Sequence, residues 1–105
     1  KIFEGNSGPK EVKTNIIDPP IVARFIRLMA VTWVEGIAFR LELLGCKLKQ
    51  CSSPLGMESR AIRDNQISAS SSYNQDWLPK DVRLNNNKAW SPRTSSGSEW
   101  LQIDL

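Results

Sequence analysis

The chain contains no histidine, and only two of its 105 residues are cysteines. A structural zinc site uses four cysteine or histidine ligands, so Cys46 and Cys51 cannot form one by themselves. Nucleophilic catalysis by serine or cysteine needs a neighbouring base, most often histidine. Loop acids such as Asp76 and Asp81 carry no other sign of acid–base chemistry. We therefore expect no metal, no cofactor and no enzyme activity.

Long apolar runs, blocks of basic residues and N-glycosylation sequons are also missing. A membrane-spanning helix needs about 20 apolar residues, and no signal peptide is recognisable at Lys1, so any such signal would lie outside this piece. The net charge of +3 is spread along the chain, which argues against a nucleic-acid patch. The length allows one small domain at most.

Apolar and polar residues alternate along several short segments, which is the pattern of half-buried β-strands. In Ile37–Leu44 the residues Ile37, Phe39, Leu41 and Leu43 share one face. Leucine and glutamate also favour helices, so a helix is the competing interpretation there. Further strands are predicted at Lys10–Ile17, Ile21–Met29, Gln66–Ser70 and Glu99–Leu105.

Two long polar segments, Ser71–Lys80 and Asn85–Ser98, separate the later strands. Loops of this length in a small domain are usually either functional or disordered. Each contains a tryptophan, Trp77 in the first and Trp90 in the second, which argues against disorder. These loops are therefore the best candidates for a binding site.

Two stretches of the chain together resemble the discoidin family, also called the factor V/VIII type C domains. Residues 19–46 contain PPIVARFIRLMAVTW and IAFRLELLGC, which resemble the closing third of such a domain. Residues 51–105 begin with CSSPLGMESRAIRDNQISASSSY and end with EWLQIDL, which resemble its opening third. The resemblance covers nearly the whole chain, and both motifs are specific.

The order of these stretches is unusual, because the end of a domain precedes a beginning and the central strands are missing. One explanation is a junction of tandem domains, with 1–46 as the C-terminal third, 47–50 as the linker and 51–105 as the N-terminal third of the next. This is the interpretation we favour, because tandem repeats are usual in the family. The alternative is a single permuted, shortened unit spanning 1–105.

The resemblance implies an extracellular, all-β, jelly-roll-like β-barrel, whose first and last cysteines close the two chain ends. In a junction Cys46 and Cys51 would each pair outside the chain, whereas in a permuted unit they would pair with each other. Trp33, Trp90 and Trp100 lie next to strand-like segments, and we expect them to be buried structural residues. The resemblance also implies an internal Arg–carboxylate network, with Arg27, Arg40, Glu42 and Asp104 as candidates. The alternative is that these charged side chains are exposed to solvent on outward faces.

Polar loops at one end of the barrel bind ligands in this family. Tyr73 and Trp77 are spaced like the aromatic pair of the neuropilin-type peptide pocket, but Ser95 stands where that pocket has an acid. An anionic or polar ligand is therefore the more plausible one. The candidate ligand-binding residues are Tyr73, Asn74, Gln75, Asp76, Trp77, Leu78, Lys88, Arg93, Thr94 and Ser95.

Three functions fit these residues. The first is an extracellular adhesion module, part of a larger protein, that binds a cell-surface protein, glycan or lipid head group through loops 71–80, 85–89 and 91–98. The second is a module for anionic membranes that contain phosphatidylserine, and the third is a structural spacer.

Overall fold

The computed structural model describes residues 2–8, 11–19, 21–46 and 53–105. Regular structure in these residues is all β apart from single turns of 3₁₀ helix, which confirms the predicted class. None of the described segments forms a helix that is long and apolar enough to cross a membrane. The elements are β1 (Phe25–Leu28), β2 (Leu44–Gly45), β3 (Ser53–Pro54), η1 (Asp64–Gln66), β4 (Ile67–Ala69), η2 (Pro79–Val82) and β5 (Leu101–Asp104).

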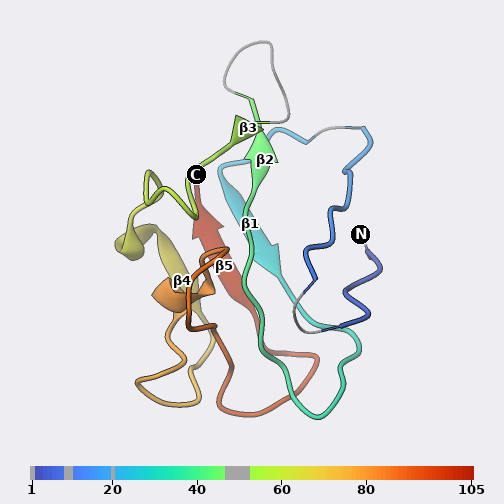
Figure 1. Cartoon of the computed structure of the whole chain (residues 1–105), viewed down its shortest axis with the longest axis vertical. Helices are drawn as coiled ribbons and strands as arrows, with labels where there is room; N and C mark the ends of the chain where they lie inside the picture. The colour runs from blue at the N-terminus through green and yellow to red at the C-terminus, as the bar shows by residue number, and fades with distance from the viewer. Residues whose placement is uncertain (1, 9–10, 20, 47–52) are drawn as a thin grey trace.

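The main sheet has β5 at its centre, with β1 and β4 antiparallel on either side (Figure 1). Ile103 of β5 lies opposite Ile26 of β1 and Ile67 of β4. The two-residue strands β2 and β3 form a separate antiparallel ladder. The strands predicted at 66–70 and 99–105 are therefore present, and the strand predicted at 21–29 is limited to β1.

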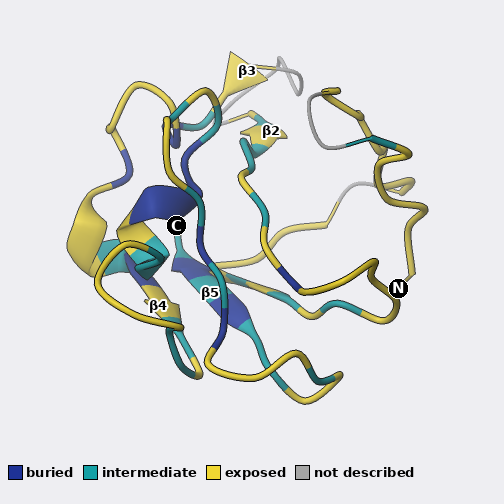
Figure 2. Ribbon diagram, turned by 60° about the horizontal axis from the view of Figure 1, so that its bottom comes forward, coloured by how far each residue is buried: buried dark blue, intermediate teal, exposed yellow. Residues whose placement is uncertain are grey.

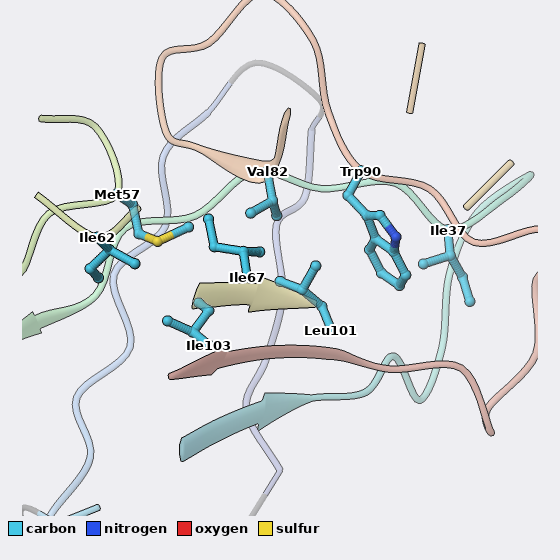
Figure 3. Close-up of a cluster of buried hydrophobic side chains, with 8 residues drawn as sticks. All are labelled: Ile37, Met57, Ile62, Ile67, Val82, Trp90, Leu101 and Ile103. Atoms are coloured by element: carbon cyan, nitrogen blue, oxygen red, sulfur yellow. The ribbon is translucent and has the colours of Figure 1, made fainter. Parts of the chain in front are cut away.

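The hydrophobic core lies on one face of this sheet, where β5 alternates between buried and half-buried residues (Figure 2). Leu101 and Ile103, which the period of two places on the same face of the strand, are fully buried. Burial of one such side chain contributes roughly 1.5–3 kcal/mol. Figure 3 shows the cluster, which consists of Ile37, Met57, Ile62, Ile67, Val82, Trp90, Leu101 and Ile103.

The apolar face predicted for Ile37–Leu44 also points to the core, but the segment is not a continuous strand. Ile37 is buried, and Phe39, Leu41 and Leu43 pack against the cluster. Its backbone pairs only at isolated bridges, Phe39 with Trp90 and Leu41 with Arg83, before it reaches β2. A continuous ladder does not form here because each neighbouring segment is a loop in which only one residue forms a bridge with this segment.

The favoured interpretation places 1–46 and 51–105 in different domains of a tandem junction. In the structure, the described residues of both parts share one sheet and one core. β1 comes from the first part and β5 from the second, and Ile37 belongs to the same core cluster as Leu101 and Ile103. The linker 47–50 and Cys51 lie outside the described residues. The domain division and the cysteine pairing therefore stay predictions.

Three expectations from the sequence are wrong. No strand forms in residues 11–17, where Val12 and Ile16 are exposed because no neighbouring strand covers them. Trp33 is 40% exposed and lies between two bends, so it is not a core residue like Trp90. Trp100 is half-buried.

The predicted Arg–carboxylate network is also replaced by another. Arg27 is exposed and lies over the Trp100 ring, with its guanidinium carbon 4.1 Å from the ring centre. Asp104 pairs with Arg24, and this exposed ion pair raises the pKa of Arg24, mainly through the hydrogen bond. Glu42 instead accepts hydrogen bonds from backbone amides, among them that of Met57 at 2.9 Å. The buried arginine of the structure is Arg83.

Candidate functional site

The loop 71–80 is shaped by a local turn centred on Asn74. The Asn74 side-chain oxygen accepts a hydrogen bond from the amide of Asp76 at 2.9 Å, and the Asn74 carbonyl accepts one from the amide of Trp77 at 3.1 Å. Asparagine favours such turns because its side chain can bond the backbone two residues on. The turn leaves residues 73–76 exposed and directs the chain back, so that Trp77 is half-buried.

The side chain of buried Trp90 is hydrogen-bonded to the start of this loop. Its indole Nε1 donates to the carbonyl of Ser71 at 3.0 Å, and its ring packs edge-on against Phe39, with 5.2 Å between ring centres. The amide of Tyr73 donates to the carbonyl of Ser91 at 2.8 Å. The loop is therefore held on an aromatic pair made of buried Trp90 and half-buried Phe39, which gives it a defined shape without regular structure.

A cleft of about 400 Å³ lies beside the loop. Its walls come from three places along the chain: the turn of the first loop, the segment before Trp90, and the segment that follows Phe39. The lining residues are Arg40, Asp76, Trp77, Asn87, Lys88 and Ala89. The Lys88 ammonium lies 3.7 Å from the Asp76 carboxylate, and both side chains are largely exposed. Two cations and one carboxylate around a tryptophan leave the cleft with a net positive charge at neutral pH.

A second polar cluster surrounds Glu99 and joins the loops 71–80 and 91–98. The Glu99 carboxylate accepts hydrogen bonds from the hydroxyls of Ser70, Ser71 and Thr94, that of Ser71 at 3.0 Å. These bonds lower the pKa of Glu99, with the Ser70 hydroxyl as the largest cause and Arg93 as a minor one. Hydroxyl donors stabilise the ionised form, so Glu99 ties the two loops together as a carboxylate.

The predicted binding residues fall into two groups. Asp76, Trp77 and Lys88 line the cleft, and Asn74 builds the turn that places them. Gln75 is exposed in the same turn, and Leu78 is half-buried at the start of η2.

The remaining predicted residues lie outside the cleft lining. Tyr73 is 61% exposed. In the second loop, the Arg93 amide donates to the Ser71 hydroxyl at 2.9 Å, and the Ser95 hydroxyl accepts from the amide of Ile37 at 3.0 Å. The Thr94 hydroxyl is bonded to Glu99. The polar groups of this loop thus take part in holding the loops in place.

Three lining residues are not among the individually named candidates: Arg40, Asn87 and Ala89. Asn87 and Ala89 flank Lys88 and lie within the predicted binding loop 85–89. Arg40 lies far away along the chain, and the sequence gives no sign of its position. Within the described residues, no cluster of acidic, cysteine or histidine side chains could hold a metal ion.

Comparison with known proteins shows similarity over nearly the whole chain. The chain is 49% identical over 109 residues to coagulation factor V of Pseudonaja textilis. It is 44% identical over 111 residues to human neuropilin-2 and 41% identical over 114 residues to lactadherin of Bos taurus. These alignments cover 98%, 100% and 100% of this chain, but only 8%, 12% and 27% of the respective relatives. No family model and no solved structure matches the chain.

The relatives are secreted or ectodomain proteins that carry discoidin-type domains, and this chain is likewise extracellular. The all-β fold and the sequence match agree with the motifs quoted above for 19–46 and 51–105. The chain belongs to the discoidin family, the factor V/VIII type C domains.

Proposed function

We propose that this chain is a non-enzymatic recognition module that binds an anionic cell-surface ligand through the loops 71–80, 85–89 and 91–98. The observation that carries the proposal is the cleft beside Trp77, whose lining holds two cations, Arg40 and Lys88, against one carboxylate, Asp76. Ligand sites are concave, and they combine an apolar wall with a few placed polar groups. The cleft has this composition.

The charges that line the cleft determine whether its ligand should be anionic or cationic. Lys88 is already close to Asp76, so the charge that is left over is positive. A cationic ligand would be repelled by this positive charge, because the one carboxylate of the cleft already pairs with Lys88. An anionic group would instead gain charge-assisted hydrogen bonds. The Glu99 carboxylate does not change this balance, because it is bonded to three hydroxyls outside the cleft lining.

The test compares two aromatic variants in the same loop. Trp77→Ala removes the wall of the cleft, and we expect it to weaken binding to a heparin-derived octasaccharide or to vesicles that contain phosphatidylserine by about tenfold or more. Tyr73→Ala is the matched control, because Tyr73 is exposed and does not line the cleft. Binding should also decrease as salt rises, because exposed charges are screened beyond about 8 Å at physiological ionic strength. Equal binding by wild type and Trp77→Ala would contradict the proposal.

An anionic membrane surface is a second candidate function, favoured by the position of Tyr73. Its side chain is exposed at the turn of the loop, and tyrosine suits an interface that is apolar on one side and wet on the other. A membrane binder would lose attachment to phosphatidylserine vesicles in the Tyr73→Ala variant, whereas a binder that uses the cleft would not. The same pair of variants therefore separates the two candidates.

A further inference from the structure

We propose that Arg40 is a ligand-binding residue that completes, together with Lys88 and Trp77, a site for a sulfated sugar. This inference rests on the proposed function and names the ligand class for the same cleft. Arg40 comes from the part of the chain that carries β1 and β2, whereas the other lining residues all come from the second part. Ligand binding would therefore depend on both parts of the chain.

The backbone on both sides of Arg40 is fixed by hydrogen bonds. Phe39 and Trp90 exchange two of them, at 3.1 and 3.2 Å. The amide of Leu41 donates to the carbonyl of Val82, and the carbonyl of Leu41 accepts from the amide of Leu84. Because the residues before and after Arg40 are both fixed, its Cα position is fixed too, and its side chain leaves the core side and lines the cleft. Arg40 is thus held on a rigid base.

The guanidinium of Arg40 retains most of its bonding capacity. It donates from one nitrogen to the carbonyl of Asn86, and the side chain is exposed. A guanidinium has five N–H donors in a planar fork, which matches the oxygens of a sulfate or carboxylate group. No acidic side chain is bonded to Arg40 among the described residues, in contrast to Arg24 and Arg83. The contact with Asn86 orients the fork without neutralising it.

The cleft fits a ring that carries an anionic group better than it fits a lipid bilayer. Trp77 is half-buried within the cleft, and its neighbours there are Asp76, Asn87 and two cations. An indole that enters a membrane must project from the surface beside other apolar side chains. A recessed indole can instead pack on the flat C–H face of a sugar ring, while Asp76 and Asn87 are available for hydroxyls and Arg40 and Lys88 for the sulfate.

The experiment measures binding of the whole chain to a heparin-derived octasaccharide by calorimetry. Arg40→Ala should weaken binding at least about tenfold, since it removes charge-assisted hydrogen bonds. Arg40→Lys should recover part of the loss, because it keeps the charge but not the fork. Arg63→Ala is the charge-matched control, since Arg63 is exposed and outside the cleft lining, and it should change the affinity by less than about threefold. Thermal unfolding of each variant checks that the fold is intact.

The outcomes separate this inference from the proposed function. If Lys88→Ala weakens binding but Arg40→Ala binds like wild type, the role of Arg40 is overturned and the proposed function stands. If the chain binds phosphatidylserine vesicles and not the octasaccharide, the sugar is overturned as the ligand. If it binds neither probe, both the proposed function and this inference fail. A parallel loss in Arg40→Ala and Lys88→Ala, with Arg63→Ala unchanged, supports the inference.

Discussion

The Nη2 atom of Arg83 lies 2.8 Å from the Oδ1 atom of Asp64, and only 3% of the Arg83 side chain is exposed, against 52% of the Asp64 side chain. The same guanidinium donates to the carbonyls of Met57 and Ile62, each at 2.7 Å. A buried cation costs free energy unless it is paired and hydrogen-bonded. Arg83 meets this requirement through its two Nη atoms, which join the irregular segment 56–64 to the end of η2, whereas its buried Nε has no hydrogen-bond partner among the described residues.

Replacement of Arg83 by methionine should destabilise the fold by about 3 kcal/mol or more. It removes one charged partner of Asp64 and leaves the carbonyls of Met57 and Ile62 without their donor. Urea unfolding measures the loss. Arg60→Met is the control, because Arg60 is 3.9 Å from the same Asp64 oxygen but is largely exposed, and it should cost less than about 1 kcal/mol. Equal losses in the two variants would show that the buried bonds of Arg83 contribute little.

Acid should destabilise the fold through Asp64 and Glu99. Their pKa values are lowered from the ordinary 3.8 and 4.5, mainly by the hydrogen bond from Arg83 and that from Ser70, respectively. A group with a lowered pKa contributes stability above its unfolded value and loses it as the pH falls through the folded value. The melting temperature should therefore decrease with acid below about pH 4.5. Glu99→Gln should flatten this decrease, and an unchanged slope would exclude Glu99 as a contributor.

Gly56→Ala should be strongly destabilising. Gly56 has a φ of 129°, and a Cβ atom there would lie 2.6 Å from the Cβ of Ala61 and 2.7 Å from the backbone nitrogen of Ile62. Backbone strain and the clash together should cost about 2 kcal/mol or more. Gly97→Ala is the comparison, since its nearest atom, the carbonyl oxygen of Ala30, is 3.9 Å away. Calorimetry should show a melting temperature below that of the wild type for Gly56→Ala and an unchanged one for Gly97→Ala.

The 105-residue chain should unfold in a single cooperative transition, because Ile37 shares its core with Leu101 and Ile103. Tryptophan fluorescence and circular dichroism should then give coincident curves in urea. Two separate transitions would instead support independent bodies formed by 1–46 and 51–105. Peptide mapping without reduction would add the cysteine connectivity, which distinguishes a junction from a permuted unit.

The sequence predicts those parts of the fold that have a period of two. The alternation in Ile37–Leu44 predicts an apolar face that begins with Ile37, and the alternation in Glu99–Leu105 puts Leu101 and Ile103 on one face; all three residues are buried. Met57 and Val82 are also fully buried, but they lie in turns and in η2, where no periodic pattern marks an inward face. The buried Arg83 was missed for the same reason, since an arginine in a polar segment is usually exposed.

The sequence predicts the candidate site only where its residues are close together along the chain. Asp76, Trp77 and Lys88 stood out because an aromatic residue and charges lie in polar loops. Arg40 lies in a strand-like segment, and its place in the cleft follows from the pairing of Phe39 with Trp90. Such a contact depends on tertiary structure, which local patterns do not encode.

The central position of β5 also affects how the protein is made. Its strand neighbours are synthesised earlier, and cross-strand partners such as Arg27 and Gln102 are 75 residues apart. During translation β1 and β4 therefore leave the ribosome before the strand that joins them exists. Contacts between residues so distant in the chain slow folding and leave unpaired strand edges exposed in the meantime. Until β5 is synthesised, β1 and β4 each lack the strand with which they pair in the sheet.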